Sequence, residues 1–552
     1  MHYDVLTEPW IPVVDNQGKR RELGLLALLA QAHELKVVSD PAPPIQLGLY
    51  RFLVTFVQTA LQIQEFEDLE DVLSEEKFDV EPFERYVEQV GISRFDLFDA
   101  EHPFLQSPPF PDDDKRRKSV VELFYHLPAG TNVTHFLHMT EDDHAVSPAV
   151  AARALCSISP FMTAGGAGYS PSINGTPPWY VMALGENLFE TILYNCCVME
   201  MPGLEHPTPP VWASESPLVP RAERTCTSLA EGYTWQPRRV RLLPSNGGIC
   251  TYLGRESPVL IRDMVWGPGH KFVGHDTWKD PQVAYERNQK RDMWLALRPR
   301  EGKQLWRDYG PLFLLREKDP SNRVFSRPEI VNQISTLKAE GIVSADKAEQ
   351  FEVYGMRTDK AKIFEWYYER LPLSTGVLSS PTSGVQVQLA VDLAEQVAGR
   401  LTSAVRCLYP SRAPGSQTKE QASANVKALN RLVERALLEY WKSMEVFFMG
   451  PYLQALSRQA PDDEDAREKL LDSWKEELRK VGWGCLDEAV KAVETNAASL
   501  ERQVRARNVF AAGLAKVLGE RKSKQERREN LHDSRDDSIT IDATVRRTIT
   551  GA

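Results

Sequence analysis

The chain has 552 residues and a formal net charge of -11, with 42% hydrophobic and 26% charged residues. This length exceeds what a single core serves and predicts a globular protein of several domains. No apolar run approaches the roughly 18 residues of a membrane helix, and the first residues lack the pattern of a signal peptide. We therefore expect a cytoplasmic protein with no membrane partner. The acidic total argues against coating nucleic acid by bulk charge, but is compatible with local basic patches.

The seven cysteines are expected to be reduced and mostly buried. No pair has the spacing C-x-x-C, and no histidine lies at zinc-finger spacing from a cysteine. The sequence therefore predicts no metal site and no cofactor.

The N-terminal two thirds has a mixed pattern. Short strands and a turn are predicted in residues 4–19, and apolar spacing predicts helices in 21–35 and 44–62, the second of them buried. Residues 146–159 predict a short helix with Ser147 as N-cap and Pro148 in its first turn.

Strand-like pieces follow, separated by proline and glycine. They are "RRVRLLP" (238–244), "MWLALRP" (293–299) and "PLFLLRE" (311–317). Together with the preceding helices, they indicate an α+β fold for a large, irregular N-terminal domain.

Long amphipathic patterns dominate the C-terminal part. They predict four helices, in residues 384–410, 418–449, 462–481 and 487–518, with Gly482 just after the third and a break near Thr495 in the fourth. Helices with short connections favour a four-helix bundle. The predicted domains are an α+β domain at 1–374, the bundle at 380–518, and a charged, mobile tail at 519–552.

The stretch "TAGGAGYSPSINGTPP" (163–178), called the glycine loop below, is rich in glycine and proline. It lacks the spacing of a nucleotide-binding P-loop and of a dinucleotide fold. Glycine allows a backbone to approach a groove closely, because it has no Cβ. A plain connecting loop is the alternative.

One basic stripe is predicted on the second of the four helices. Lys427, Arg431 and Arg435 are four residues apart and share a face that could contact phosphates. The alternative is a solvated face paired with Glu434 and Glu501.

Five motifs occur in an order that resembles a known family. They are "EPWIPV" (8–13), "AEHPFLQ" (100–106), "GTNVTHFLH" (130–138), "NGTPP" (174–178) and "WQPRRV" (235–240). With the C-terminal helices, they resemble the large subunit of the type I-E CRISPR Cascade complex, the CasA family, over roughly residues 3 to 515.

The resemblance implies a non-catalytic subunit of an RNA-guided complex. Its expected partners are the other Cascade subunits, the 5′ handle of the guide RNA, target double-stranded DNA and a helicase-nuclease. It implies recognition of the protospacer-adjacent motif from the minor groove and opening of the duplex (R-loop formation) in antiviral defence. In RNA-guided complexes in general, the protein recognises the short motif, and base pairing with the guide RNA recognises the remaining sequence.

The implied DNA-binding residues lie in three segments. Gly165 and Gly166 match the family's glycine loop, and Lys271 matches its groove-reaching lysine. The third segment, "GMRTDKAK" (355–362), matches a hairpin whose tip enters the duplex; here Asp359, Lys360 and Ala361 stand where relatives often have Asn-Gln-Ala.

Further contacts are implied more loosely. Asn132 and Phe136 match a loop near the guide handle, where an aromatic ring could stack on a base. Their alternative is a turn asparagine and a buried phenylalanine. Arg357, Lys427, Arg431 and Arg435 are expected as phosphate contacts. Asp359 would repel DNA unless Arg357 pairs with it.

Two other functions remain open from the sequence. One is a metal-dependent nuclease that uses His275 and Asp276, although the further ligands of such a site are missing. The other is a scaffold that joins subunits without recognising DNA.

Overall fold

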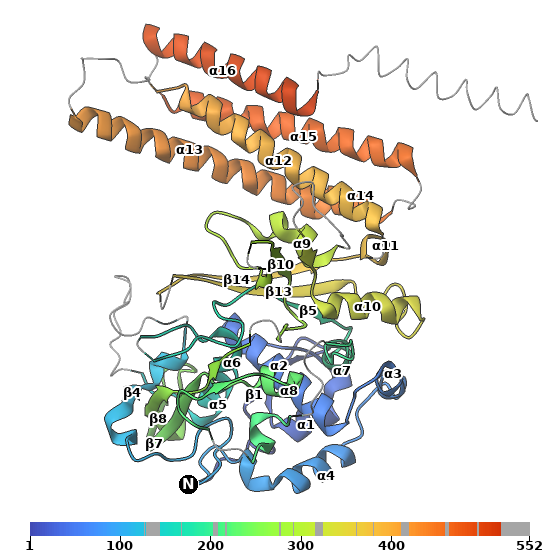
Figure 1. The fold of residues 1–552 in the computed structure, drawn as a ribbon, viewed down its shortest axis with the longest axis vertical. Helices are drawn as coiled ribbons and strands as arrows, with labels where there is room; N and C mark the ends of the chain where they lie inside the picture. The colour runs from blue at the N-terminus through green and yellow to red at the C-terminus, as the bar shows by residue number, and fades with distance from the viewer. Residues whose placement is uncertain are drawn as a thin grey trace, which may run out of the picture. The chain divides into compact units, whose positions relative to one another are not determined.

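The computed structural model describes residues 1–125, 127, 144–166, 168–201, 208–215, 218–274, 278–290, 292–314, 324–359, 362–378, 380–409, 419–458, 463–493 and 496–519. The chain divides into two compact units, Met1–Gly384 and Val385–Ala552. The first unit mixes helices and strands, and the second is helical (Figure 1). The α+β prediction is therefore confirmed. Within the described part of the chain, no helix has both the length and the apolar character needed to cross a membrane.

The first unit begins with a small antiparallel sheet in the order β2-β1-β3. Its strands are β1 (Ile11–Asp15), β2 (Arg20–Leu23) and β3 (Leu35–Val38), and α1 (Leu25–Ala30) lies between the last two in sequence. The predicted strands and the turn after Asp15 are present, with Gly18 at a φ of +82°. This positive φ explains the glycine, because residues with a Cβ rarely adopt it.

Helix α2 (Pro43–Ala60) forms the centre of the first unit's core, as its apolar pattern predicts. It packs close to α5 (Pro148–Cys156), where a Cβ on Gly48 would lie 2.6 Å from the carbonyl carbon of Cys156. The predicted start of α5 is confirmed, since the Ser147 hydroxyl accepts a hydrogen bond from the Val150 N–H. The remaining helices of this unit are α3 (Phe66–Ser74), α4 (Glu81–Val90), α6 (Ile158–Phe161), α7 (Leu188–Tyr194), α8 (Leu229–Tyr233), α9 (Tyr309–Phe313), α10 (Glu329–Ala339) and α11 (Thr375–Leu378).

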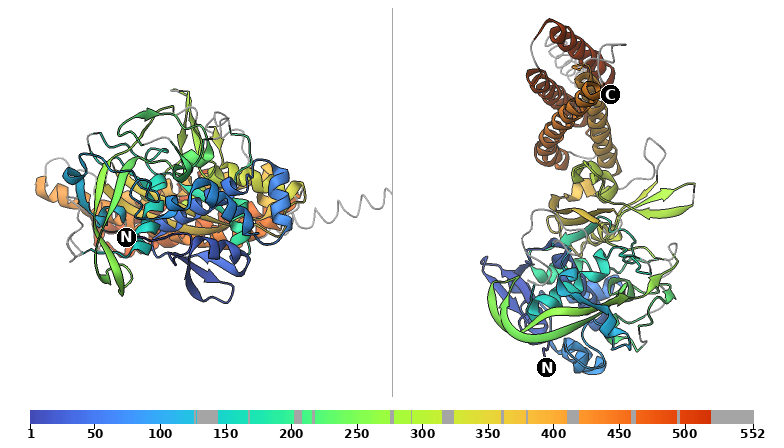
Figure 2. Two further views of the ribbon diagram at one scale, coloured as in Figure 1. Left: turned by 90° about the horizontal axis from the view of Figure 1, so that it is seen from below. Right: turned by 90° about the vertical axis from the view of Figure 1, so that its left-hand side faces the viewer.

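A long antiparallel hairpin follows the "WQP" motif (Figure 2). It consists of β7 (Arg238–Cys250) and β8 (Arg255–Pro268), and β4 (Arg117–Ser119) pairs with the outer edge of β8. Immediately after β8, β9 (Lys271–Phe272) pairs in parallel with β6 (Glu223–Arg224). This short parallel pairing joins two segments that are far apart in sequence.

Two further sheets complete the first unit. One has the order β14-β13-β5, from β5 (Tyr180–Leu184), β13 (Gln350–Asp359) and β14 (Lys362–Pro372); the other has the order β11-β10-β12, from β10 (Tyr285–Asn288), β11 (Met293–Ala296) and β12 (Phe325–Ser326). The predicted strand at 311–317 is wrong, because Tyr309–Phe313 form α9. A short apolar run does not by itself distinguish a strand from a buried helical turn.

The second unit consists of long helices whose faces bury aromatic residues. Its elements are α12 (Pro381–Arg406), which begins before the boundary between the units, α13 (Lys419–Phe447), a π-helical turn (Phe448–Tyr452), α14 (Leu453–Ser457), α15 (Glu464–Lys491) and α16 (Ala497–Leu518). The Trp474 Nε1–H donates to the Ala390 carbonyl at 2.8 Å, and the Tyr440 hydroxyl donates to the Ala394 carbonyl at 3.0 Å. These bonds attach α15 and α13 to the backbone of α12.

The predicted helix end at Gly482 is wrong, because α15 continues through it to Lys491. A Cβ on Gly482 would lie 2.8 Å from the Phe510 ring, so the glycine serves the close packing of α15 against α16. A break near Thr495 is present in the sense that α15 ends at Lys491 and α16 begins at Ala497. Thr495 itself and the tail from residue 520 lie outside the described residues.

All seven cysteine thiols are free, and each except the half-buried Cys407 is buried. Burial raises the pKa of the Cys485 thiol to about 11 and that of Cys197 to about 12. Since the thiolate is the reactive form, these groups are inert core residues.

Candidate nucleic-acid interface

The glycine loop exposes bare backbone at its first glycines. Ala164, Gly165 and Gly166 are exposed. Gly166 has a φ of +122°, and a Cβ there would meet nothing within 4 Å. A Cβ on Gly165 would lie 3.4 Å from Nη2 of Arg238, which is an ordinary contact distance. The first unit therefore has room for a Cβ at position 165, so space does not explain this glycine. At position 166, the backbone conformation favours glycine.

The side chain of Arg238 fixes the conformation of the glycine loop. Its guanidinium donates hydrogen bonds to the carbonyl oxygens of Thr163 and Ser170, on the two sides of the exposed glycines. It also lies 4.9 Å from the ring centroid of Tyr169 and 5.8 Å from that of Trp266. A planar guanidinium can bond two acceptors at once and stack on aromatic rings. One side chain therefore fixes the backbone on both sides of the exposed glycines.

Among the described residues, Arg238 bonds carbonyl oxygens and forms no ion pair with a carboxylate, although it is only 3% exposed. Burial lowers the pKa of its guanidinium to about 10, which still leaves it charged at neutral pH. A buried cation bonded to carbonyls keeps part of its charge unneutralised, and this makes the potential around the loop more positive.

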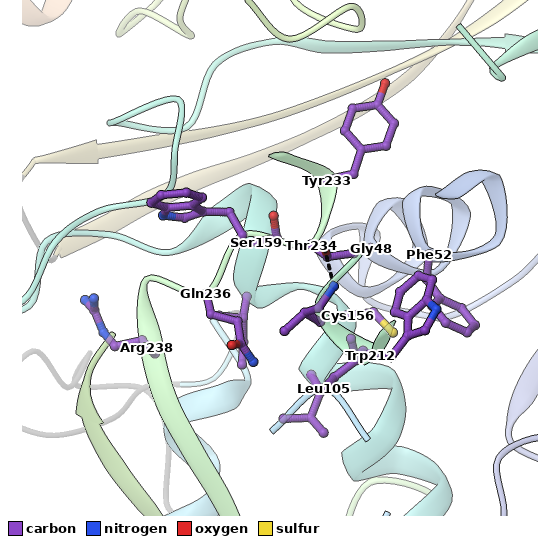
Figure 3. Close-up of a pocket in the computed structure, with 14 residues that line it drawn as sticks. Gly48, Phe52, Leu105, Cys156, Ser159, Trp212, Tyr233, Thr234, Gln236 and Arg238 are labelled. Carbon is purple, nitrogen blue, oxygen red and sulfur yellow. Dashed lines mark hydrogen bonds between the residues drawn. The ribbon is translucent and has the colours of Figure 1, made fainter. Parts of the chain in front are cut away.

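The pocket below Arg238 is too small for a cofactor. Figure 3 shows Arg238 at its edge, with the guanidinium directed away from Trp212 and Phe52. Its volume of about 30 Å³ corresponds to one or two water molecules. The structural role of Arg238 is therefore to bond the glycine loop and not to line a ligand pocket.

The backbone of Arg238 connects the glycine loop to the predicted lysine. Arg238 pairs with Pro268 across the β7–β8 hairpin, and the N–H groups of Gly269 and His270 donate to the Pro237 and Gln236 carbonyls at 3.1 and 2.9 Å. A Cβ on Gly269 would lie 2.3 Å from the Gln236 carbonyl oxygen, so this position requires glycine. The segment that leads into Lys271 is thus anchored beside the residue that holds the loop.

Lys271 is exposed and engaged in an ion pair. Its Nζ lies 2.7 Å from Oε1 of Glu223, its register partner on β6. The hydrogen bond and charge of Lys271 lower the pKa of the Glu223 carboxyl. In the free chain, the ammonium predicted to reach DNA is therefore held by Glu223, an acid that was not among the predicted site residues.

The segment 355–362 forms the predicted hairpin. Thr358 pairs with Ile363 and Asp359 with Lys362, and Asp359 is exposed at the end of β13. Lys360 and Ala361, the rest of the predicted tip, lie outside the described residues. No hydrogen bond or ion pair between described residues connects Asp359 to the glycine loop or to Lys271.

Arg357 pairs with two acids other than Asp359. Its guanidinium lies 2.9 Å from Glu365 and 3.5 Å from Glu301, and it stacks 4.7 Å above the Phe364 ring. Glu365 is its partner across the hairpin, on the same face, which explains the choice of acid. A phosphate would have to compete with both carboxylates for this arginine.

The remaining predicted residues are distributed as follows. Lys427, Arg431 and Arg435 are all exposed on α13, in the second unit, and no ion pair between described residues joins them to Glu434 or Glu501. Asn132 and Phe136 lie outside the described residues, as do His275 and Asp276. In the part of the chain that the structure describes, no group of three or more His, Cys, Asp or Glu side chains could hold a metal ion.

Arg238 and Glu223 belong to this site although neither was predicted as part of it. Arg238 lies in the "WQPRRV" motif, where two adjacent arginines open an apolar strand. Since buried arginines need partners, this was a usable signal. No sequence signal marks Glu223, because only the β6–β9 pairing brings it to Lys271, 48 residues away.

The fold is that of CRISPR-associated Cse1 proteins. The chain is similar to Cse1 from Acidimicrobium ferrooxidans (21% identity, covering 94% of this chain and 98% of that chain, TM-score 0.73). It is similar to CasA (Cse1) from Thermus thermophilus (24% identity, 93% and 99% covered, TM-score 0.71). It also matches a chain of a structure described as a CRISPR RNA-guided surveillance complex (18% identity, 92% and 99% covered, TM-score 0.68).

Residues 4–485 match the family described as CRISPR-associated protein Cse1. The chain therefore belongs to the Cse1 (CasA) family, the large subunit of the type I-E Cascade. Among curated proteins, no sequence match was found.

Proposed function

We propose that this chain is the non-catalytic Cascade subunit that recognises the protospacer-adjacent motif in duplex DNA from the minor groove. The observation that supports this most is the arrangement around Arg238. Its side chain holds the exposed glycine loop, and the carbonyls of the two preceding residues, Gln236 and Pro237, hold the segment that leads into Lys271. Two segments predicted to face DNA from sequence thus belong to one structural element.

The chemistry of this arrangement suits the minor groove. Bare backbone at Gly165 and Gly166 can enter a groove about 6 Å wide, which a larger side chain would obstruct. Because the minor groove mainly distinguishes A·T from G·C, we expect several related motifs to be accepted. A lysine beside the loop supplies the positive charge that the narrow groove attracts.

Opening of the duplex is assigned to the β13–β14 hairpin. Its exposed end at Asp359 is expected to unstack the base pair next to the motif, at a cost of a few kcal/mol. Pairing with the guide RNA then captures the separated strand and forms the R-loop. The completed complex recruits the helicase-nuclease.

The acidic net charge of -11 fits a subunit that does not hold DNA alone. The other Cascade subunits and the guide RNA, near its 5′ handle, complete the binding channel. We expect weak, salt-sensitive DNA binding by the isolated chain, because phosphate contacts lose affinity steeply with salt. We expect no DNA cleavage by the purified chain in Mg²⁺ or Mn²⁺.

The test is a binding comparison in a reconstituted complex. The other subunits are loaded with guide RNA, and target duplexes with and without candidate motifs are titrated with this chain present, absent, or replaced by Gly166→Asp. The proposal predicts that the chain confers motif-dependent affinity and that Gly166→Asp removes it. Affinity that is the same with and without the chain would contradict the proposal and favour a scaffold.

A further inference from the structure

Arg221 lies between the glycine loop and the Lys271 segment. A Cβ on Gly168 would lie 2.9 Å from its Nε and 3.0 Å from its Nη2, so its guanidinium rests against the loop. Its own N–H donates to the Gly269 carbonyl at 2.7 Å, and the next residue, Ala222, accepts from the Lys271 N–H at 2.8 Å. One arginine therefore contacts both segments that are proposed to face the DNA.

The backbone of Arg221 has a conformation that favours glycine. Its φ is +64°, and the Ala222 N–H donates to the Val219 carbonyl at 3.1 Å, closing a four-residue turn. Pro220 is the second residue of this turn and Arg221 the third, which is the pattern of a type II turn, where glycine or asparagine usually occupies the third position. Strained backbone positions of this kind are enriched at binding and active sites.

The charge of Arg221 is not used within the described structure. The residue is exposed, and no ion pair with a described acid is present at its guanidinium. The nearby acid Glu223 is bound to Lys271 at 2.7 Å. The turn thus presents an unneutralised guanidinium at the edge of the exposed glycine backbone.

We propose that Arg221 binds a backbone phosphate of the target duplex beside the groove that the glycine loop enters. This inference rests on the proposed function. Phosphates line both edges of the minor groove, and a guanidinium is suited to them because it donates two parallel hydrogen bonds. Target DNA is favoured over the guide RNA because Arg221 contacts the loop and the Lys271 segment, both of which are proposed to face the duplex.

The test uses the complete, guide-loaded complex with Arg221→Gly and Arg221→Asn. Both residues tolerate a positive φ, so the unfolding temperature of the chain should stay the same or rise. Arg85→Gln is the control, since it removes one exposed arginine of α4 that pairs with Glu81. Affinity for a motif-containing duplex is measured at several salt concentrations, with a motif-free duplex alongside.

We expect both Arg221 variants to bind about fivefold more weakly at about 0.15 M salt and to reduce the slope of log affinity against log salt by about 0.9, the value for one phosphate that is no longer neutralised. The ratio of motif to motif-free affinity should stay the same, because phosphate contacts do not specify sequence. Arg85→Gln should change neither quantity.

Three results would overturn the assignment. An unchanged salt slope in both Arg221 variants, with motif-dependent binding intact for the unaltered chain, would refute the Arg221 contact alone. Weaker association of either variant with the guide-loaded complex in the absence of DNA would place the contact on the guide or a partner subunit. Absence of motif dependence for the unaltered chain would refute the proposed function itself.

Discussion

Arg238 donates a hydrogen bond to the carbonyl of Thr163, 75 residues earlier in the chain, and through it fixes one end of the glycine loop. The same guanidinium bonds the Ser170 carbonyl, on the other side of the exposed glycines. A loop whose backbone must enter a groove benefits from being ordered before it binds, because the entropy of ordering is then not lost on association.

Arg238→Lys should disorder the loop. Lysine keeps the charge but lacks the planar fork that reaches both carbonyls. We expect a stability loss of about 2 kcal/mol, the scale of a hydrogen bond to a charged group, and faster amide exchange in the loop. Motif-dependent affinity should fall by about tenfold, the equivalent of about 1.4 kcal/mol.

Arg239→Lys is the matched control for this experiment. Arg239 is the adjacent residue, equally buried, and pairs with Asp112 at 2.8 Å rather than with the loop. It should destabilise the chain without changing amide exchange at Gly166. Equal exchange in the loop of both variants would show that Arg238 does not order it.

Glu223→Gln should strengthen DNA binding by the complex. It releases Lys271 from its ion pair, so the ammonium no longer has to leave a carboxylate to reach DNA. We expect a gain of about two- to fivefold, in the range of an exposed charge pair. In the Lys271→Ala background the gain should shrink, which a double-mutant cycle measures. A gain of the same size without Lys271 would show that Glu223 simply repels the DNA.

His270 should make the fold sensitive to mild acid. Burial, and to a smaller extent the charge of Arg224, lowers its pKa from 6.5 to about 4. Between these values the unfolded chain binds a proton that the folded chain does not, so stability falls as the pH drops from about 6.5 to about 4. The Nε2 of His270 accepts the Val219 N–H at 3.4 Å, at the turn that holds Arg221, and protonation would break this bond.

The measurement is unfolding of the full chain at pH 7 and pH 4.5, with His270→Asn as the comparison. The unaltered chain should lose about 2 kcal/mol more than the variant over this range. An identical pH dependence of stability in the unaltered chain and in His270→Asn would mean that protonation of His270 does not destabilise the folded chain.

The basic face of α13 is tested by changing Lys427, Arg431 and Arg435 to glutamine together. All three are exposed, so the stability should stay within about 0.5 kcal/mol. If they bind the displaced strand, the salt slope of DNA binding by the complex should fall by about 0.9 for each phosphate that they neutralise. The triple control removes Lys442, Lys480 and Lys491, which are exposed and paired with acids three residues earlier. Equal salt slopes for the triple variant and the triple control would show that the basic face of α13 is solvated and does not bind phosphates.

The helices of this protein were more predictable from sequence than its contacts. The apolar spacing of α2 and the Ser147-Pro148 start of α5 are local signals, and the structure has both. Gly482 was misinterpreted because glycine also permits close packing, here of the Phe510 ring. A single sequence cannot distinguish these two uses of glycine.

The candidate site shows the same division. Gly165, Gly166 and Lys271 were selected through a family resemblance, and their grouping became visible only through Arg238 and the β6–β9 pairing. The pairing of Arg357 with Glu365 was not predicted, because a bulge between Arg357 and Thr358 sets the register of the hairpin. Such long-range pairings leave no periodic pattern in sequence.

The most direct test of minor-groove recognition is Gly165→Ala in the reconstituted complex. The free chain accommodates this methyl group, since its nearest neighbour would be Nη2 of Arg238 at 3.4 Å. Stability should therefore change by less than about 0.5 kcal/mol, and Gly399→Ala, on α12 with nothing within 4 Å, controls for the substitution itself. If DNA approaches this backbone, affinity for motif-containing duplex falls at least about tenfold while motif-free binding is unchanged. Undiminished motif-dependent affinity in Gly165→Ala would contradict recognition through this loop.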